Sequence, residues 1–299
     1  MKGAHKKMKI DAVFSGGGVK AYSYIGVLQS LEKKGLEVSR IAGTSAGAII
    51  SALLIAGYTS NEIKKHLLSL SLKKFLDPPT YTSILPFSKW YNLFFKMGFY
   101  KGKQLEIWLR EILARKNIYT FNDIKDDCLK IIVSDLSLKR LVVLPDDLKD
   151  VYGIQKNDFS IARAVRISAG YPLFFMPETI NHQPALQKSL LVDGGIVSNF
   201  PLWVFKDELL RFKRPTLGVK IVGDNQEVQI NNMVELLQAM LLTMKQSYDE
   251  RYLDQNIKDI LFLRVDSVET MNLSLGKKDK EKMISQAKER TDNFLQTWP

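Results

Sequence analysis

The chain has 299 residues, of which 45% are hydrophobic and 25% charged, so its composition is that of an ordinary globular protein. Its 43 basic residues outnumber the 32 acidic ones and give a formal net charge of +11. Such an excess indicates affinity for an anionic partner, either lipid headgroups or nucleic acid, unless it is only a solvated basic surface. Because the basic residues are scattered and no nucleic-acid-reading motif occurs, we do not expect a nucleic-acid partner.

The single cysteine, Cys128, excludes an intramolecular disulfide and favours a reducing compartment. It precedes the apolar run 129–133, so we interpret it as a buried structural thiol. Residues 1–9 form a basic tail with no long apolar segment behind it, and no secretory signal peptide is expected. No apolar run reaches the roughly 20 residues that span a bilayer. The sequence therefore predicts a cytoplasmic protein, whose charge suits peripheral contact with an anionic membrane.

The chain opens with a pattern typical of one βαβ unit. Residues 10–14 predict a buried strand, 15–20 a glycine-rich loop, 21–34 a helix stopped by Gly35, and 38–42 a second strand. The unit fills about 32 residues, which suits a right-handed crossover between parallel strands. The loops that follow parallel strands meet at one edge of the sheet, where active sites of open α/β sheets lie.

The glycine-rich loop holds three successive glycines, Gly16, Gly17 and Gly18. It matches neither the G-x-x-x-x-G-K-[ST] nor the G-x-G-x-x-G phosphate-binding pattern. It is either a plain tight turn or an oxyanion hole, in which backbone N–H groups converge with no side chain in the way. Donors placed at a tetrahedral oxyanion are worth roughly 3–4 kcal/mol each in acyl transfer.

A G-x-S-x-G pentapeptide follows the second strand, with Ser45 between Gly43 and Gly47. Residues 46–56 are small and apolar and predict a buried helix. A serine on a sharp turn between a strand and a helix has the context of a nucleophile elbow, and the glycines remove side chains that would clash in that turn. The other interpretation is a small-residue turn without chemistry.

The middle of the chain combines helical patterns with an aromatic stretch. Residues 59–72 predict a helix capped by Ser60 or Asn61, and residues 104–116 predict another. Between them, residues 75–103 hold many aromatic side chains, three prolines and interleaved lysines. This segment is either a core subdomain or an exposed lid or lipid-contact segment, because aromatics and lysines suit the membrane interface.

The second half continues the α/β pattern without a linker. The predicted strands are 129–135, 141–144, 189–192, 216–222 and 260–265, the first two being neighbours, and the predicted helices are 159–167 with Ser160 as N-cap, 231–252 and 278–298. We therefore expect one α/β domain over residues 10–299, with helices on both faces of a mainly parallel sheet.

The strand 189–192 runs directly into Asp193, which is followed by Gly194 and Gly195. A carboxylate at a strand end is either a solvated turn residue or a catalytic group. Ser45 needs a base, and no histidine follows Asp193 in the chain, as the serine, acid, histidine order of α/β hydrolases requires. A triad of Ser45 with His182 and an acid such as Asp135 is one alternative. The simpler hypothesis is a dyad in which Asp193 itself accepts the hydroxyl proton.

Four blocks of the chain resemble the patatin-like phospholipase family. They are Gly16-Gly17-Gly18-Val19-Lys20, Gly43-Thr44-Ser45-Ala46-Gly47, the S-x-x-x-P block from Ser168 to Pro172, and Asp193-Gly194-Gly195 with Asn199 and Pro201. The blocks cover roughly residues 10–205, in the order and spacing of the family. One departure is Ala21, where the family has glycine after the basic residue.

The resemblance implies a three-layer α/β/α fold and lipid acyl hydrolysis, with no metal or other cofactor. It implies Ser45 as nucleophile, Asp193 as proton acceptor, and Gly16, Gly17 and Gly18 as the oxyanion loop. Lys20 has three possible roles: it is a helix-face cation, it steadies the glycine loop, or it draws an anionic headgroup toward the site. A lipid- or membrane-binding protein that retains the fold without catalysis is the alternative to an enzyme.

Overall fold

The computed structural model describes residues 8–79, 88–182, 187–207, 209, 211–222, 230–250, 254–265 and 273–299. Within them, a central sheet has the strand order β10-β9-β1-β2-β4-β8-β7, and β5 also pairs with β4. The strands are β1 (Met8–Phe14), β2 (Leu36–Thr44), β4 (Leu129–Asp135), β5 (Arg140–Leu144), β7 (Glu178–Asn181), β8 (Lys188–Asp193), β9 (Thr216–Val222) and β10 (Ile260–Arg264).

The sheet is parallel from β10 to β4 and antiparallel where β4 meets β8 and β5, and where β8 meets β7. All seven residues of β4 are buried, as are the last five of β1. Such continuous burial is expected for parallel strands covered on both faces, and it explains their uninterrupted apolar sequences. The order places the loops that follow β1 and β2 side by side at one edge.

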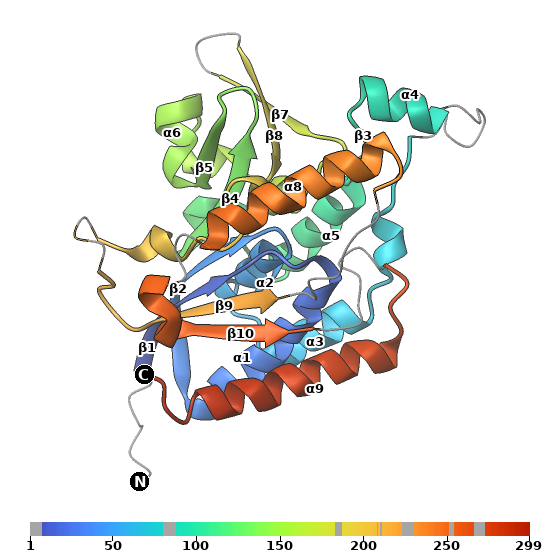
Figure 1. Cartoon of the computed structure of the whole chain (residues 1–299). Helices are drawn as coiled ribbons and strands as arrows, with labels where there is room; N and C mark the ends of the chain where they lie inside the picture. Colours follow the sequence, from blue (N-terminus) through green and yellow to red (C-terminus); the bar gives the residue numbers. More distant parts are fainter. Residues whose placement is uncertain are drawn as a thin grey trace.

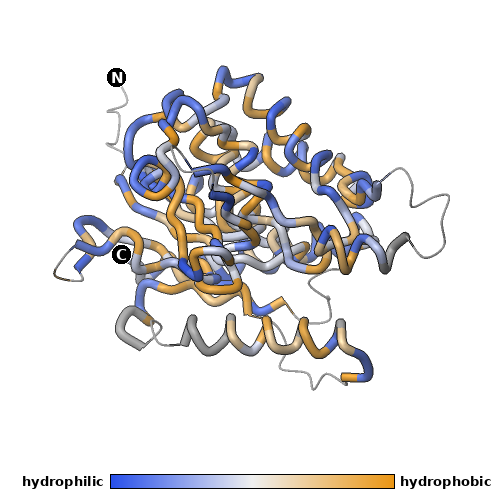
Figure 2. Tube along the Cα trace, turned by 90° about the horizontal axis from the view of Figure 1, so that it is seen from above, coloured by the Kyte–Doolittle hydropathy of each residue, from blue (hydrophilic) through white to orange (hydrophobic). Residues whose placement is uncertain are grey.

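Helices cover both faces of this sheet, as the sequence predicts for a three-layer α/β/α fold (Figure 1). The helices are α1 (Ser23–Lys34), α2 (Ala46–Ile55), α3 (Ser60–Leu68), α4 (Ser88–Phe95), α5 (Lys103–Ala114), α6 (Asp146–Tyr152), α7 (Ile161–Ser168), α8 (Met233–Glu250) and α9 (Lys277–Phe294). In Figure 1, α2 lies behind the sheet and α8 crosses in front of it. Figure 2 shows α8 standing apart along one side of the molecule.

The α2 side of the sheet contains the larger part of the core. Helix α1 packs on α9, α5 packs on α7, and α2 packs on β1, β2 and β4. A smaller apolar cluster, with Phe200, Leu202 and Phe205 from the segment after β8, packs against Val13 and Ala42. The described helices include none that is long and apolar enough to cross a bilayer.

Most predicted elements are confirmed, with shifts at their ends. The helix predicted over 21–34 begins as a 3-10 turn, η1 (Gly18–Tyr22), before α1 continues to Lys34, and Gly35 ends it at φ 73°. The strand 216–222 coincides with β9. The C-terminal helix is α9, and Met283, Ala287 and Leu295 are buried while Phe294 is partly buried.

Two predictions about α3 are wrong. Its N-cap is Thr59, not Ser60 or Asn61, because Thr59 and Glu62 form a capping box. The hydroxyl of Ser60 instead donates to the Glu32 carboxylate at 2.5 Å. The helix also ends at Leu68, before the predicted residue 72.

The aromatic stretch 75–103 divides between core and surface. Phe75 is buried against Trp108, and β3 (Gly98–Tyr100) pairs with β6 (Leu173–Phe175). By contrast, Phe94 and Phe95 on α4 are exposed. Residues 80–87 of this stretch lie outside the described residues, as do residues 1–7 of the basic tail and residues 251–252 of the helix predicted over 231–252. Helices α4 and α6 and strands β3, β6 and β7 were not expected.

Candidate active site

Ser45 occupies a strained turn between β2 and α2. Its backbone has φ 55° and ψ −125°, a conformation that residues with a side chain rarely adopt. The flanking glycines permit this turn, because a Cβ at Gly47 would lie 2.4 Å from the Phe14 carbonyl oxygen and one at Gly43 would lie 2.5 Å from the Gly47 carbonyl oxygen. The predicted elbow geometry is therefore present. At Gly43 and Gly47, backbone atoms of neighbouring segments occupy the space that a side chain would need.

Ser168, at the end of α7, holds this turn in place. Its hydroxyl accepts a hydrogen bond from the Ser45 amide at 2.9 Å and donates to the Ile132 carbonyl on β4 at 2.6 Å. Ser168 is fully buried, so neither bond competes with water. The sequence placed Ser168 in the S-x-x-x-P block but gave it no role. It is a positioning residue for the elbow.

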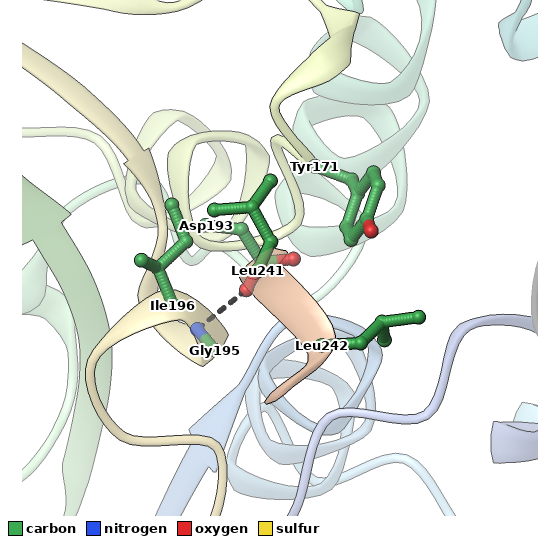
Figure 3. A pocket seen from close by; sticks show the side chains of 6 residues that line it. All are labelled: Tyr171, Asp193, Gly195, Ile196, Leu241 and Leu242. Atoms are coloured by element: carbon green, nitrogen blue, oxygen red, sulfur yellow. Dashed lines mark hydrogen bonds between the residues drawn. The ribbon is translucent and has the colours of Figure 1, made fainter. Parts of the chain in front are cut away.

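Asp193 lies against the Ser45 hydroxyl. Ser45 Oγ donates to Asp193 Oδ2 at 2.6 Å, and Asp193 Oδ1 accepts from the Gly195 amide at 2.7 Å (Figure 3). The Asp193 amide donates to the Gly170 carbonyl at 3.0 Å, and the residue is 4% exposed. A Cβ at Gly194 would lie 2.2 Å from the Ile132 carbonyl oxygen, so only glycine fits after Asp193. The carboxylate is thus held toward Ser45 by backbone contacts on both sides.

The glycine loop lies next to Ser45 and is braced by Asn199. The Gly16 amide donates to the Asn199 backbone carbonyl at 3.1 Å, and Asn199 Nδ2 donates to the Gly16 carbonyl at 3.4 Å. A Cβ at Gly16 would lie 2.4 Å from Asn199 Oδ1 and 3.0 Å from Ser45 Cβ. The prediction of Gly16 as an oxyanion donor therefore needs correction, because its amide is already engaged; Gly16 instead lets the loop approach the serine.

The other two glycines keep their amides available. Within the described residues, neither the Gly17 nor the Gly18 amide donates to a protein acceptor. Gly18 has φ 53°, which favours glycine, and Gly17 packs closely on Ile221. These two amides are the candidates for binding an oxyanion.

Lys20 follows this loop and is only 7% exposed. Its ammonium donates to the Val265 carbonyl at 3.0 Å, just after β10 ends. Of the three roles considered for Lys20, this contact favours a brace for the segment after the glycine loop. A buried ammonium does not reach out to an anionic headgroup.

The structure does not bring a histidine to Ser45 as the alternative triad requires. His182 Nε2 shares a hydrogen bond with Ser189 Oγ at 2.7 Å, and its ring stands edge-on to Tyr152. Asp135 accepts from the Tyr152 hydroxyl at 2.8 Å. His182 and Asp135 thus belong to a network around Tyr152, and the triad hypothesis is wrong. The ring of His66, on α3, packs edge-on against Tyr58, which precedes that helix. His5 lies outside the described residues.

A small pocket opens beside Asp193. Its walls are Tyr171, Asp193, Gly195, Ile196, Leu241 and Leu242 (Figure 3). Burial and, to a lesser degree, the charge of Asp193 raise the pKa of Tyr171. Leu241 and Leu242 come from α8, which packs on η6 (Gly194–Ile196). The sequence carried no signal for these two leucines, because their proximity depends on how α8 crosses the sheet.

The part of the chain that the structure describes contains no group of three or more His, Cys, Asp or Glu residues arranged to hold a metal ion.

A mainly parallel sheet with helices on both faces, and a strained turn at its edge that holds Ser45 against a carboxylate, defines a protein of the α/β class. The model of the patatin-like phospholipase family matches residues 12–206 of the chain, which is well over half of it. The chain belongs to the patatin-like phospholipase family.

Several relatives match most of this chain. The uncharacterized protein YqhO of Bacillus subtilis (strain 168) is 39% identical over 295 residues, covering 97% of this chain and 99% of that protein. The probable lipid hydrolase 463L of Invertebrate iridescent virus 6 is 24% identical, covering 91% of this chain and 83% of that protein.

Solved structures share the fold at low sequence identity. VipD from Legionella pneumophila has a TM-score of 0.58 and 19% identity, covering 98% of this chain and 67% of that chain. ExoU in its complex with SpcU from Pseudomonas aeruginosa has a TM-score of 0.54 and 18% identity, covering 97% of this chain and 51% of that chain. At such identity these similarities concern the fold alone.

Proposed function

We propose that the protein is a lipid acyl hydrolase that cleaves carboxylic esters through an acyl-enzyme on Ser45. The observation that carries the proposal is the 2.6 Å contact between Ser45 Oγ and Asp193 Oδ2. Further support comes from family membership, from the name of the viral relative, a probable lipid hydrolase, and from the apolar side chains Ile196, Leu241 and Leu242 beside the carboxylate. An apolar wall suits the acyl chain of a lipid ester.

Acylation begins when Ser45 Oγ attacks the ester carbonyl carbon and its proton passes to Asp193. The carbonyl oxygen takes the negative charge, and the Gly17 and Gly18 amides donate to it. When the tetrahedral intermediate collapses, the carbon–oxygen bond to the alcohol breaks, and Asp193 returns the proton to the leaving alkoxide. The products of this half-reaction are the alcohol, or lysolipid, and acyl-Ser45.

Deacylation uses the same groups in reverse. Asp193 takes a proton from a water molecule as the water oxygen attacks the acyl carbonyl. The Gly17 and Gly18 amides bind the second oxyanion, and Ser45 Oγ leaves with the proton held by Asp193. The free fatty acid departs, and the hydrogen bond between Ser45 and Asp193 forms again.

The test uses a fluorophosphonate probe, which labels an activated serine, together with hydrolysis of a short-chain ester and of dispersed phospholipids. Wild type should be labelled and active, while Ser45→Ala should lose both properties. Asp193→Asn keeps the size of the side chain but removes the proton acceptor, so hydrolysis should fall by roughly 10³-fold or more. Unchanged activity in Asp193→Asn would show that the dyad is wrong.

A control variant separates loss of chemistry from loss of fold. Ser134, on the strand next to Asp193, is buried and contacts the Gly194 carbonyl only at 3.5 Å. Ser134→Ala should keep both labelling and hydrolysis within a few-fold of wild type. Loss of both in this control as well would indicate general damage to the β4–β8 region.

A further inference from the structure

Helix α8 carries an exposed apolar stripe of five residues. They are Met233, Leu236, Leu237, Met240 and Met244, which are 69%, 41%, 39%, 53% and 56% exposed. Their spacing of i, i+3, i+4, i+7 and i+11 places them on one side of the helix. A helix of a globular protein normally turns such a side toward the core, so this stripe is a candidate interaction surface.

The stripe belongs to the helix that covers the candidate active site. Leu241 and Leu242 of α8 line the pocket beside Asp193, and the helix packs on η6, which follows that residue. In Figure 2, α8 stands apart from the rest of the chain along one side. Whatever binds the stripe therefore contacts the same helix that lines this pocket.

A second exposed apolar group lies on α4 and the turn after it. Tyr91, Phe94, Phe95 and Met97 are 51%, 74%, 69% and 44% exposed. Exposed Lys96 stands among them, and exposed Lys101 follows β3. Both figures place α4 at the end of the molecule where α8 begins. Aromatic side chains mixed with lysines favour the interface of an anionic bilayer, in keeping with the net charge of +11.

We propose that the α8 stripe is the docking surface by which this protein binds an anionic lipid bilayer, with the aromatic side chains of α4 as a second contact. The proposal rests on the proposed function for one point only, namely that a bilayer is where the lipid ester substrate resides. Docking through α8 sets the helix that lines the candidate site against the membrane in which a lipid ester resides.

The experiment measures binding to vesicles in a Ser45→Ala background, so that no hydrolysis products alter the membrane. The stripe variant is Leu236→Gln with Met240→Gln, since glutamine is a good helix former and leaves the charge unchanged. The matched control is Leu136→Gln with Leu138→Gln, two leucines that are 44% and 40% exposed around the β4–β5 turn. Sedimentation with vesicles of phosphatidylcholine and phosphatidylglycerol reports binding.

The stripe variant should bind these vesicles about tenfold or more weakly than its parent, whereas the control should bind equally well. Vesicles of phosphatidylcholine alone should bind the parent more weakly than the anionic vesicles. Equal binding by parent and stripe variant would overturn the proposal, as would a parent that binds neither kind of vesicle. Self-association of the parent that the stripe variant loses, with vesicle binding unchanged, would assign the stripe to a second copy of the chain and likewise overturn it.

A second measurement separates this proposal from the proposed function. With Ser45 intact, fluorophosphonate labelling and hydrolysis of a soluble short-chain ester report on the site without a membrane. Failure of both in wild type would disprove the hydrolase while the vesicle result still judges the docking surface. A stripe variant that keeps the soluble activity and loses about tenfold or more of the activity on vesicles is the expected result.

Discussion

Strain at a single residue is central to the site. Ser45 keeps a left-handed backbone conformation because the Ser168 hydroxyl holds its amide and the two glycines remove steric conflicts. The strain points the hydroxyl away from both the strand and the helix and toward Asp193. The backbone conformation of Ser45 therefore explains how a common pentapeptide forms a candidate active site in this protein.

Removal of the Ser168 hydroxyl tests this account. Ser168→Ala leaves the Ser45 amide and the Ile132 carbonyl without a partner, and each unpaired buried group costs about 1–3 kcal/mol. We expect kcat for a soluble ester to fall by roughly 10-fold to 100-fold with little change in KM, because the nucleophile loses its position rather than its substrate.

Two further variants complete this test. Ser168→Thr keeps the hydroxyl and should recover most of the lost kcat. Ser30→Ala removes another buried hydroxyl that donates to a backbone carbonyl, that of Lys288, and should leave kcat unchanged. A Ser168→Ala enzyme with wild-type kcat would contradict the positioning role.

Cys128 gives a prediction with a defined pH dependence. Burial raises the pKa of its thiol to about 11 from an ordinary value near 9, so the thiolate population at neutral pH is about 100-fold lower than that of a free cysteine. Because the folded pKa lies above the unfolded one, the thiol form stabilises the fold below the unfolded pKa, and this contribution is lost as the pH rises through the folded pKa.

Iodoacetamide labelling of the native protein between pH 7 and 9 should therefore be slow, and unfolding in denaturant should restore the rate of an ordinary thiol. Cys128→Ala gives the background of the assay. Rapid labelling of the native chain at pH 7 would contradict the structural role that we assign to this thiol.

At the scale of elements, the packing of α9 on α1 depends on one glycine. A Cβ at Gly26 would lie 2.2 Å from the Ile284 carbonyl oxygen and 2.7 Å from the Lys288 amide nitrogen. Both of these are backbone atoms of α9, so the two helices touch backbone to backbone at this point.

The substitution Gly26→Ala has two opposing effects on the free energy of unfolding, one from helix propensity and one from packing. Alanine is favoured over glycine by about 1 kcal/mol in an isolated helix, but the added methyl group must push α9 away. We expect the free energy of unfolding to fall by about 1–3 kcal/mol in urea titrations. Ser285→Ala, at an exposed position of α9, should change it by less than about 0.5 kcal/mol. An increase in stability for Gly26→Ala would show that α9 is not held this closely.

The helices and strands differ in how well the local sequence pattern predicts them. Buried strands and amphipathic helices have strong periodic signals, so β4, β9, α7 and α9 were predicted nearly to their ends. Strands β6 and β7 and helix α6 are short, and their stability comes from neighbours far away in sequence rather than from their own pattern. The cap of α3 was misplaced because Ser60 and Thr59 are both good caps. The capping box of Thr59 with Glu62, and the contact of Ser60 with Glu32 on α1, distinguish them.

For the whole molecule, a buried charge pair joins the central strands β1 and β2. Asp11 on β1 is fully buried and accepts from Arg40 on β2 at 2.5 Å, and Arg214 lies 3.4 Å from its other oxygen. Removing one partner of a buried ion pair leaves the other charge uncompensated, which typically costs about 3–5 kcal/mol.

Asp11→Ala should therefore lower the free energy of unfolding by about 3–5 kcal/mol, measured by urea denaturation. Lys156→Ala removes an exposed pair with Asp126 and should cost less than about 1 kcal/mol. If Asp11→Ala and Lys156→Ala lower the free energy of unfolding by similar amounts, the Asp11 ion pair is as well hydrated as a surface pair. Because Asp11 makes none of the contacts with Ser45 or Asp193 described above, its variant should affect stability far more than the chemistry at Ser45.

The sequence by itself determined the α/β class, the strands of the central sheet other than β7, the elbow at Ser45, and the pairing of Ser45 with Asp193 as a hypothesis. Short-range patterns carry this information, because a strand, a glycine turn and a helix are specified by adjacent residues. Only the tertiary structure decided that the Gly16 amide is engaged by Asn199, that Ser168 supports the elbow, and that α8 crosses the site with its apolar stripe outward. These features join residues more than 120 positions apart or depend on the rotation of a helix about its axis, and no local pattern records either.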